Sequence, residues 1–322
     1  MINALEIINH NGEMLRCLLE NPESSGFSID KIDGLGPGKI NLNSKELPGM
    51  DGGLVTNARM PPRNIVLYCT LYDWFGNHYQ TIEQSRNRLY DLFSIKTTVT
   101  LIIETDLHRY KISGIVESNE PDIFSPEESM QVSIICPMPY FVLDDPNTGE
   151  SGEIEQSIFT TVGLFEFPWT NPIYSREIEF GVSASNDDRW STLQYSGDVD
   201  VGVIFKLKVL SIGSPNYIWI QYYGNSEQNN EVTWIRFSNI AFNWGLQADD
   251  ELIISTVPRN KYAIIKRGTE TINALRYVKL GGEWIKFHKG PNVLRLVLTD
   301  IAGDTPTELS ATVEYQELYA GV

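Results

Sequence analysis

The stretch "IICPMPYF", residues 134–141, lies near the middle of the 322-residue sequence. Its two prolines follow an apolar run and give the clearest sign in the sequence of where a strand ends. Its first residues are apolar and β-branched, as in a strand. Pro137 lacks a backbone N–H and biases Cys136 away from helix, so we expect strand pairing to end at Cys136. Two readings stay open at this point. The stretch is either a chemical site on Cys136 or a stiff joint, with Pro139 limiting the exit and Tyr140 and Phe141 anchoring it to the domain surface.

The residues before this stretch predict a β-rich domain with one helix. Residues 63–72 form a strong candidate strand, dense in β-branched and aromatic side chains. The helix is predicted over residues 81–94, where Thr81 and Gln84 have the spacing of a capping box. Its apolar residues fall on one face at helical spacing, namely Ile82, Leu89, Leu92 and Phe93. Three candidate strands follow, and we expect the helix to pack on the β domain.

The residues after this stretch predict a second, all-β domain. The segment 143–153 is polar, contains Pro and Gly and lacks apolar periodicity, which is typical of a linker. We therefore predict a first domain over residues 1–143, a linker over 144–152 and a second domain over 153–322. About ten short candidate strands in the second domain indicate an antiparallel β-sandwich of jelly-roll type. Gly281 and Gly282 join two of them and predict a type I′ hairpin.

The formal net charge of −17 limits the possible functions. Both halves of the chain are acidic, whereas sequence-independent binding to nucleic acid needs clustered Lys and Arg. No window approaches the roughly 20 consecutive apolar residues of a membrane span. The first residues lack a basic segment followed by an apolar core, so we expect no secretory signal. An acidic surface repels DNA, a property that suits a protein past which DNA must slide.

The chemically reactive residue types are scattered. Three cysteines are far apart and form no C-x-x-C pair, so we expect buried, reduced thiols. The four histidines have no metal-ligand spacing between any two of them. The segment "GLGPGK", residues 34–39, lacks the spacing of a Walker A loop and is read as a plain turn. The sequence thus predicts no catalytic, cofactor-binding or metal-binding residue and no enzyme.

Three groups of acids are candidates for carboxylate chemistry: Asp187 with Asp188, Asp198 with Asp200, and residues 249–251. A glycosidase needs two carboxylates facing one another across a sugar. Neighbouring residues of a strand point to opposite faces, so adjacent acids do not meet this need by themselves. We interpret these groups as solvated loops or turns, with a calcium site around Asp198 and Asp200 as the open alternative.

Six of the seven tryptophans lie in the second half of the chain. Trp219, Trp234 and Trp284 fall inside alternating strands, where packing is the default role. Trp169 and Trp190 fall in expected loops. For these two, packing or assembly contacts and stacking on sugar rings are both open.

The ordered set of motifs in the first half resembles a known family. The motifs are "DGG" at Asp51, "RNIVL" at Arg63, "RLYDLF" at Arg88, "YKISGIVE" at Tyr110 and the closing "ICPMPYF". In order and spacing, residues 1–145 look like the N-terminal domain of the distal tail proteins of tailed bacteriophages. The second half is similar in layout, and its segment 259–298 resembles the end of these proteins.

The resemblance implies a mainly β fold: a split-barrel-like first domain with one packed helix, followed by a galectin-like sandwich. It also implies a structural protein of the virion tail tip that forms a hexameric ring around a channel for DNA. Its partners would be further copies of itself, the tail tube protein, the tail-tip or baseplate hub protein and a receptor-binding protein. The alternative is a carbohydrate-binding protein that recognises host cell-wall glycans through its sandwich.

Overall fold

The structure is a computed structural model of the whole chain, and it is mainly β, as the sequence predicts. The residues that it describes are 1–19, 25–46, 49, 51–75, 78–125, 127–144, 153–158, 189–210, 215–224, 233–242, 245–299 and 309–322. The chain divides into two compact units. The first unit comprises Met1–Gly152 together with Leu318–Val322, and the second comprises Glu153–Glu317.

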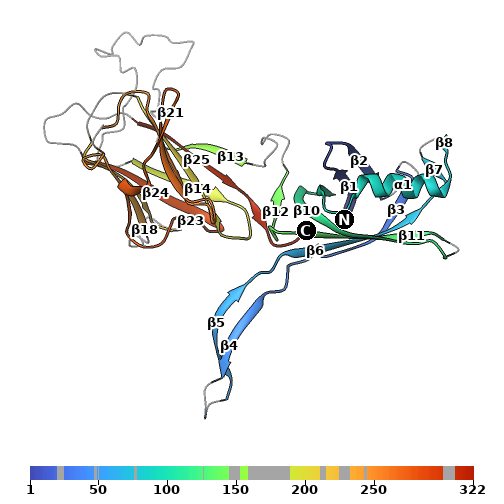
Figure 1. The fold of residues 1–322 in the computed structure, drawn as a ribbon. Coiled ribbons are helices and arrows are strands. Elements are labelled where there is room, and N and C mark those ends of the chain that lie inside the picture. The colour runs from blue at the N-terminus through green and yellow to red at the C-terminus, as the bar shows by residue number, and fades with distance from the viewer. Residues whose placement is uncertain are drawn as a thin grey trace, which may run out of the picture. The chain divides into compact units, whose positions relative to one another are not determined.

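The first unit is built on a nine-stranded antiparallel sheet (Figure 1). Seven strands follow one another in the order β2-β1-β9-β10-β11-β6-β3. Two short strands extend it, since β12 pairs with both β10 and β26. The bounds are β1 Ile2–Ile8, β2 Met14–Leu18, β3 Phe27–Asp33, β6 Arg63–Leu71, β9 Thr98–Thr105, β10 Arg109–Asp122, β11 Ser129–Cys136, β12 Phe141–Leu143 and β26 Leu318–Tyr319.

One helix, α1 (Ile82–Leu92), packs on this sheet (Figure 1). The predicted capping box is present, because Thr81 accepts from the Gln84 amide and Gln84 accepts from the Thr81 amide. Leu89 and Phe93 are fully buried and join the core formed by the inward side chains of the strands. The helix is therefore held mainly by its apolar face, as its sequence spacing predicts.

Two hairpins complete the first unit. β7 (Trp74–Phe75) and β8 (His78–Tyr79) form a short one beside the start of α1. β4 (Asn41–Glu46) and β5 (Gly53–Arg59) form a longer one that projects away from the sheet (Figure 1). The sequence predicts no hairpin over these two segments, so the projecting hairpin is a finding of the structure.

The second unit contains two antiparallel sheets and the small pair β15–β23. One sheet has the order β13-β25-β16-β19-β20-β21, and the other has the order β14-β24-β17-β18-β22. The bounds are β13 Glu153–Ile158, β14 Arg189–Tyr195, β15 Val201–Gly202, β16 Ile204–Val209, β17 Tyr217–Tyr222, β18 Thr233–Ser238, β19 Glu251–Ser255, β20 Tyr262–Arg267, β21 Glu270–Asn273, β22 Val278–Leu280, β23 Lys286–Phe287, β24 Gly290–Thr299 and β25 Leu309–Gln316, with a 3-10 turn, η2, at Leu275–Tyr277.

Side chains from both sheets meet in the interior of the second unit. Tyr195 of β14 and Tyr315 of β25 lie edge to face with ring centroids 5.9 Å apart. Phe287 of β23 contacts Tyr315 at 5.6 Å and Tyr222 of β17 at 6.4 Å. The unit is therefore a two-layer sandwich with an aromatic core.

The predicted type I′ hairpin at Gly281 and Gly282 is wrong. β22 pairs with β18, and β23 pairs with β15, so the two glycines connect strands of different sheets. Gly281 serves another purpose, because a Cβ atom there would overlap the indole ring of Trp234. The glycine is needed for close packing rather than for a positive φ. A further strand expected around residues 175–185 lies outside the described residues.

The last five residues also depart from the expected division. The sequence reading assigned them to the sandwich, but β26 pairs with β12 in the first unit. The Val322 amide donates to the Leu35 carbonyl at 3.0 Å, and Tyr319 lies 5.2 Å from Tyr110. The chain thus leaves the first unit after residue 152 and returns to it at residue 318. Among the described residues, no helix is long and apolar enough to span a membrane.

Candidate functional site

The "IICPMPYF" stretch forms the turn between β11 and β12, inside the first unit. Pairing of β11 ends at Cys136, as the proline that follows predicts. Pro137 and Met138 are exposed, whereas Phe141 begins β12 and is fully buried in the core. The prolines therefore shape a turn inside the first unit, and the stiff joint between domains, one of the two readings of this stretch, is not formed here. Phe141 anchors the turn in the core instead of at the domain surface.

Cys136 is a core residue and not a reactive thiol. Its side chain is fully buried, and a Cβ atom added to Gly114 on β10 would lie 2.8 Å from its sulfur. Burial raises the pKa of Cys136 to about 11, although the nearby Arg63 opposes this shift. The residue is therefore a neutral thiol at pH 7. Cys17 and Cys69 are likewise free and buried, as expected.

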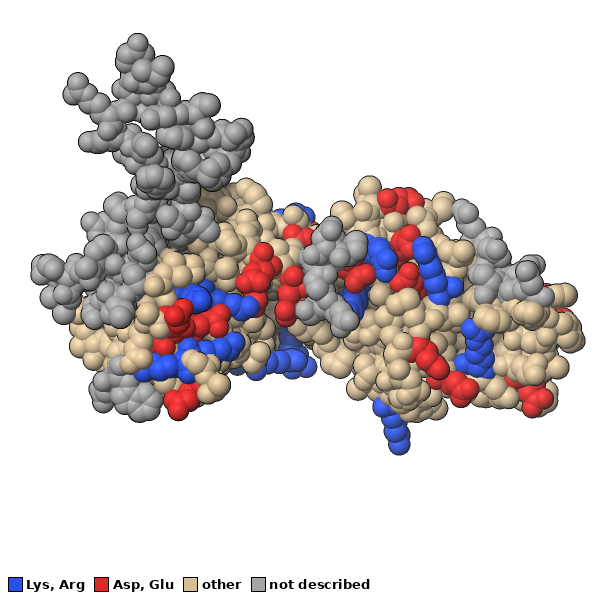
Figure 2. Space-filling model, turned by 90° about the horizontal axis from the view of Figure 1, so that it is seen from above, with Lys and Arg blue, Asp and Glu red and all other residues tan. Residues whose placement is uncertain are grey.

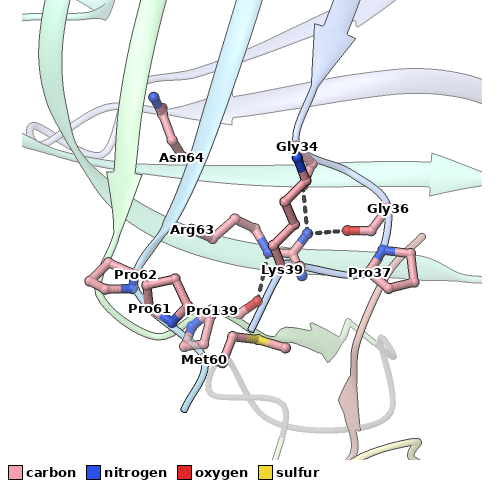
Figure 3. Close-up of a pocket in the computed structure, with 11 residues that line it drawn as sticks. Gly34, Gly36, Pro37, Lys39, Met60, Pro61, Pro62, Arg63, Asn64 and Pro139 are labelled. Carbon is pink, nitrogen blue, oxygen red and sulfur yellow. Dashed lines mark hydrogen bonds between the residues drawn. The ribbon is translucent and has the colours of Figure 1, made fainter. Parts of the chain in front are cut away.

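Arg63 is the residue that ties this turn to the rest of the unit (Figure 3). It is the first residue of β6 and is only 6% exposed. Its Nε donates to the Pro139 carbonyl at 2.7 Å, and one terminal nitrogen donates to the carbonyls of Gly34 at 2.5 Å and Gly36 at 2.6 Å. Its other terminal nitrogen donates to the Ala320 carbonyl at 2.6 Å. One guanidinium group thus connects the start of β6 to three other chain segments.

The dipoles of four backbone carbonyl groups stabilise the positive charge of Arg63. Within the described residues, Arg63 forms no ion pair with a carboxylate. Burial lowers the pKa of Arg63 from its ordinary value, but a guanidinium remains charged. Its Cζ lies 4.7 Å from the centre of the Phe141 ring, which adds a cation–π contact. The arrangement makes Arg63 a structural crosslink, a role that no local sequence pattern indicated.

The "GLGPGK" segment lies beside Arg63 and lines a pocket of about 450 Å³ together with Met60, Pro61 and Pro139 (Figure 3). A phosphate loop presents converging backbone N–H groups at the start of a helix. Here the carbonyl oxygens of Gly34 and Gly36 converge on a cation, and the segment leads into β4. The geometry is that of the plain turn expected from the sequence.

Gly34 gives a direct test of this turn. Its φ is +93°, and a Cβ atom there would overlap the backbone carbonyl oxygen of Asn64. We expect Gly34→Ala to lower the free energy of unfolding by about 3 kcal/mol, from unfavourable φ and steric overlap. Gly36→Ala is the matched control: nothing lies within 4 Å of its Cβ position, so a change below about 0.5 kcal/mol is expected. Urea unfolding followed by circular dichroism compares the two, and equal losses would contradict this account.

The projecting hairpin forms a two-stranded sheet of its own, in which β4 and β5 pair only with each other among the described residues. Every residue of β4 and β5 is exposed. Leu42 and Ala58 are cross-strand partners, and Val55 lies opposite Ser44, so Leu42, Ala58 and Val55 share one face. Leu42 is 55% exposed and Val55 54% exposed, and Leu54 on the other face is 60% exposed. A two-stranded hairpin with apolar residues open to water is marginal alone and fits a contact surface.

The acids singled out in the sequence are paired with separate bases. Asp198 binds Lys289 at 2.6 Å, and Asp200 lies 2.8 Å from Nδ1 of His288. Asp250 is buried and accepts two hydrogen bonds from Arg267, at 2.9 and 2.6 Å. No group of three potential metal ligands occurs within the described residues, and Asp187 and Asp188 lie outside them.

Opposite charges lie side by side over parts of the described surface. On the face shown in Figure 2, Lys and Arg side chains lie beside Asp and Glu side chains in each unit. In the six-stranded sheet, Lys206 pairs with Glu314 and Lys266 lies 3.5 Å from Glu251. This mutual neutralisation differs from the single-sign patch that a nucleic-acid-binding surface needs.

The positions of the tryptophans in strands and loops differ in part from the prediction. Trp190 lies in β14 instead of a loop, and it is 39% exposed. Trp219 and Trp234 lie in strands as expected, but their strand positions alternate with the buried ones and so face away from the core. Trp169 and Trp244 lie outside the described residues.

Comparisons with known proteins identify the fold. No protein-family model and no curated protein sequence matches the chain. A solved structure does match: the SPP1 Dit (gp 19.1) protein, described as a paradigm of the hub adsorption apparatus in Gram-positive infecting phages. The match has a TM-score of 0.59 at 12% sequence identity and covers 98% of both chains.

A structure of the phage P2 baseplate in its activated conformation with Ca is also similar, at 12% identity and a TM-score of 0.42 over 98% of both chains. Because the SPP1 likeness spans nearly every residue of both proteins, it includes the first unit and the sandwich. The chain therefore has the fold of the SPP1 Dit protein.

Proposed function

We propose that the protein is a distal tail protein, a structural component of a phage tail tip that forms a hexameric ring. The observation that carries this proposal is the SPP1 Dit fold over 98% of both chains. The ring joins the tail tube protein to the baseplate hub and leaves a channel for DNA. The role is structural and requires no enzymatic activity. The net charge of −17 supports a channel to which DNA does not adhere.

The projecting hairpin supports the assembly part of this proposal. A cyclic ring needs two different contact surfaces on each copy, one of which binds the other on the next copy. The hairpin offers unpaired backbone groups along both strands and the apolar face formed by Leu42, Val55 and Ala58. We assign the hairpin to the contact between neighbouring copies of the ring.

Native mass spectrometry tests the ring and the hairpin separately. The unaltered chain is expected to give a closed species of six copies. The double variant Leu42→Asp with Val55→Asp is expected to remain monomeric, because it places two charges on the apolar face. Circular dichroism should show the same fold in both proteins, since both residues are exposed.

The matched control is Leu210→Asp, an exposed leucine of the second unit, which should leave the ring intact. A purely monomeric unaltered protein at every concentration would refute the ring. Normal rings from the double variant would refute only the hairpin assignment.

A further inference from the structure

One end of the first unit exposes aromatic side chains to water. Trp74 and Tyr79 lie on the short hairpin β7–β8 and are 47% and 68% exposed. Phe124, in the turn between β10 and β11, is 95% exposed, and Ile123 beside it is also exposed. We call these four residues the aromatic end. Exposed apolar side chains that gather in one place mark an interaction surface, whereas single ones are normal on any protein.

Contacts within the unit bring these two turns to the same end of the sheet. The Leu71 amide, at the end of β6, donates to the Glu128 carbonyl at 2.9 Å, so the β10–β11 turn lies beside the residues that lead into β7. Arg86 of α1 forms an ion pair with Glu128. The guanidinium carbon of Arg88, also on α1, lies 3.6 Å from the centre of the Phe75 ring. The sheet and the helix therefore both hold the aromatic end in place.

The projecting hairpin lies at the opposite end of the same strands (Figure 1). It is inserted between β3, which ends at Asp33, and β6, which begins at Arg63. The aromatic end follows Leu71, the last residue of β6. The nine residues of β6 span about 26 Å at roughly 3.3 Å per residue, and the hairpin points away from the sheet (Figure 1). The hairpin can therefore meet an aromatic end only on another copy of the chain.

One face of the hairpin is basic. Direct cross-strand partners share a face, and alternate residues of β4 do so as well. The pairing places six residues on the face opposite Leu42, namely Asn41, Asn43, Lys45, Leu54, Asn57 and Arg59. This basic face contains two cations and no acid, although the chain has 25 basic and 42 acidic residues. Neither Lys45 nor Arg59 forms an ion pair with a described residue, and Leu54 adds an exposed aliphatic side chain.

The aromatic end carries the opposite charge. Four acids lie close to its members in the sequence and form no ion pair within the part of the chain that the structure describes, namely Asp73, Glu83, Asp122 and Glu127. Cations of Lys and Arg lie favourably over aromatic rings, and their stems pack on apolar surface. The basic face of the hairpin and the aromatic end are therefore complementary in charge and in apolar groups.

We propose that the basic face of the hairpin of one copy docks on the aromatic end of the next copy. The inference rests on the proposed ring and names the surface that receives the hairpin. A cyclic contact joins two different surfaces of one chain, and these two lie at opposite ends of β6 and carry opposite charges. Lys45 and Arg59 then face the acids around Phe124, while Leu54 packs on the aromatic rings.

Two charge-reversed variants test this contact by native mass spectrometry at low ionic strength. The first, Lys45→Glu with Arg59→Glu, makes the basic face acidic, and the second, Asp122→Lys with Glu127→Lys, makes the aromatic end basic. Each variant alone brings like charges together at every contact, so its association should be at least about 100-fold weaker than that of the unaltered chain. In a mixture of the two, alternating copies restore opposite charges at every contact. Rings with three copies of each variant should therefore form.

Lys261→Glu with Lys279→Glu is the control, because it reverses two exposed cations of the second unit and should form normal rings. Circular dichroism of both contact variants should match the unaltered chain, since all four replaced side chains are exposed. Normal rings from either contact variant alone would overturn the contact and leave the proposed ring intact. A mixture that stays monomeric, or that yields rings of random composition, would also overturn the contact. An unaltered chain that stays monomeric would instead refute the ring together with this contact.

Discussion

Replacing Arg63 with methionine is expected to lower the free energy of unfolding of the first unit by about 4 kcal/mol. Methionine fills similar space but cannot donate, so the carbonyls of Gly34, Gly36, Pro139 and Ala320 lose a charged donor together. Buried acceptors left without a donor are costly, and the contact with the Phe141 ring is lost as well.

Hydrogen exchange read by mass spectrometry is the appropriate measurement, because it reports opening free energies for each unit separately. The core amides of β6 and β11 should exchange faster in Arg63→Met, while those of the sandwich should not change. Arg63→Lys keeps the positive charge but lacks the planar guanidinium group that donates to several carbonyls at once. Its core amides should therefore exchange at rates between those of the unaltered protein and those of Arg63→Met. Arg59→Met, at an exposed position of the hairpin, is the control and should change stability by less than about 0.5 kcal/mol. A loss below about 1 kcal/mol for Arg63→Met would show that water replaces the guanidinium.

The parts of the fold that the sequence predicts are those fixed by local patterns. The helix follows from the Thr81–Gln84 capping box and from apolar residues at helical spacing, and both features act over a few neighbouring residues. β6 follows from a run rich in β-branched and aromatic residues, and every second residue of the strand is buried.

The parts that the sequence does not predict depend on contacts between distant residues. Arg63 lies 257 positions from Ala320. The alternation of β6 places Arg63 on the buried face of the strand, but it does not identify the carbonyl groups that the guanidinium binds. β4 and β5 have no buried face, so they show neither the alternation nor the apolar run that indicates a strand. In the sequence, Gly281 looks like a turn glycine. The structure shows instead that the Trp234 indole occupies the space that a side chain at position 281 would need.

The outer face of the five-stranded sheet shows the same difference between local and long-range information. The alternation of Trp219 and Trp234 with buried residues is visible in the sequence and indicates that one face of each strand is rich in tryptophan. Which residues then lie side by side depends on the register of four strands, two of which, β14 and β24, lie far apart in the chain. Only the register brings Trp190 next to Arg295, a residue more than 100 positions away.

Replacing Leu318–Val322 with the flexible sequence Gly-Ser-Gly-Ser-Gly is expected to lower the free energy of unfolding of the first unit by about 3 kcal/mol. The replacement removes the buried Leu318 side chain, the pairing of β26 with β12 and the ring contact of Tyr319 with Tyr110. Amides of β12 and of the start of β10 should lose protection from hydrogen exchange. Replacing only Gly321 and Val322 keeps β26, so this variant should lose less than half as much unfolding free energy as the replacement of all five residues.

A double-mutant cycle shows whether this segment and Arg63 act as one unit. The flexible replacement still offers a carbonyl at position 320, but that carbonyl is no longer held within reach of the guanidinium by β26. The flexible replacement therefore already removes one of the hydrogen bonds that Arg63→Met removes. The loss of unfolding free energy in the combined variant should be about 2 kcal/mol smaller than the sum of the losses in the two separate variants. Full additivity would mean that Arg63 stabilises the turn after β11 without regard to the returning strand. A shortfall would establish that the segment returning from the sandwich is held in place by the same guanidinium that orders the "ICPMPYF" turn.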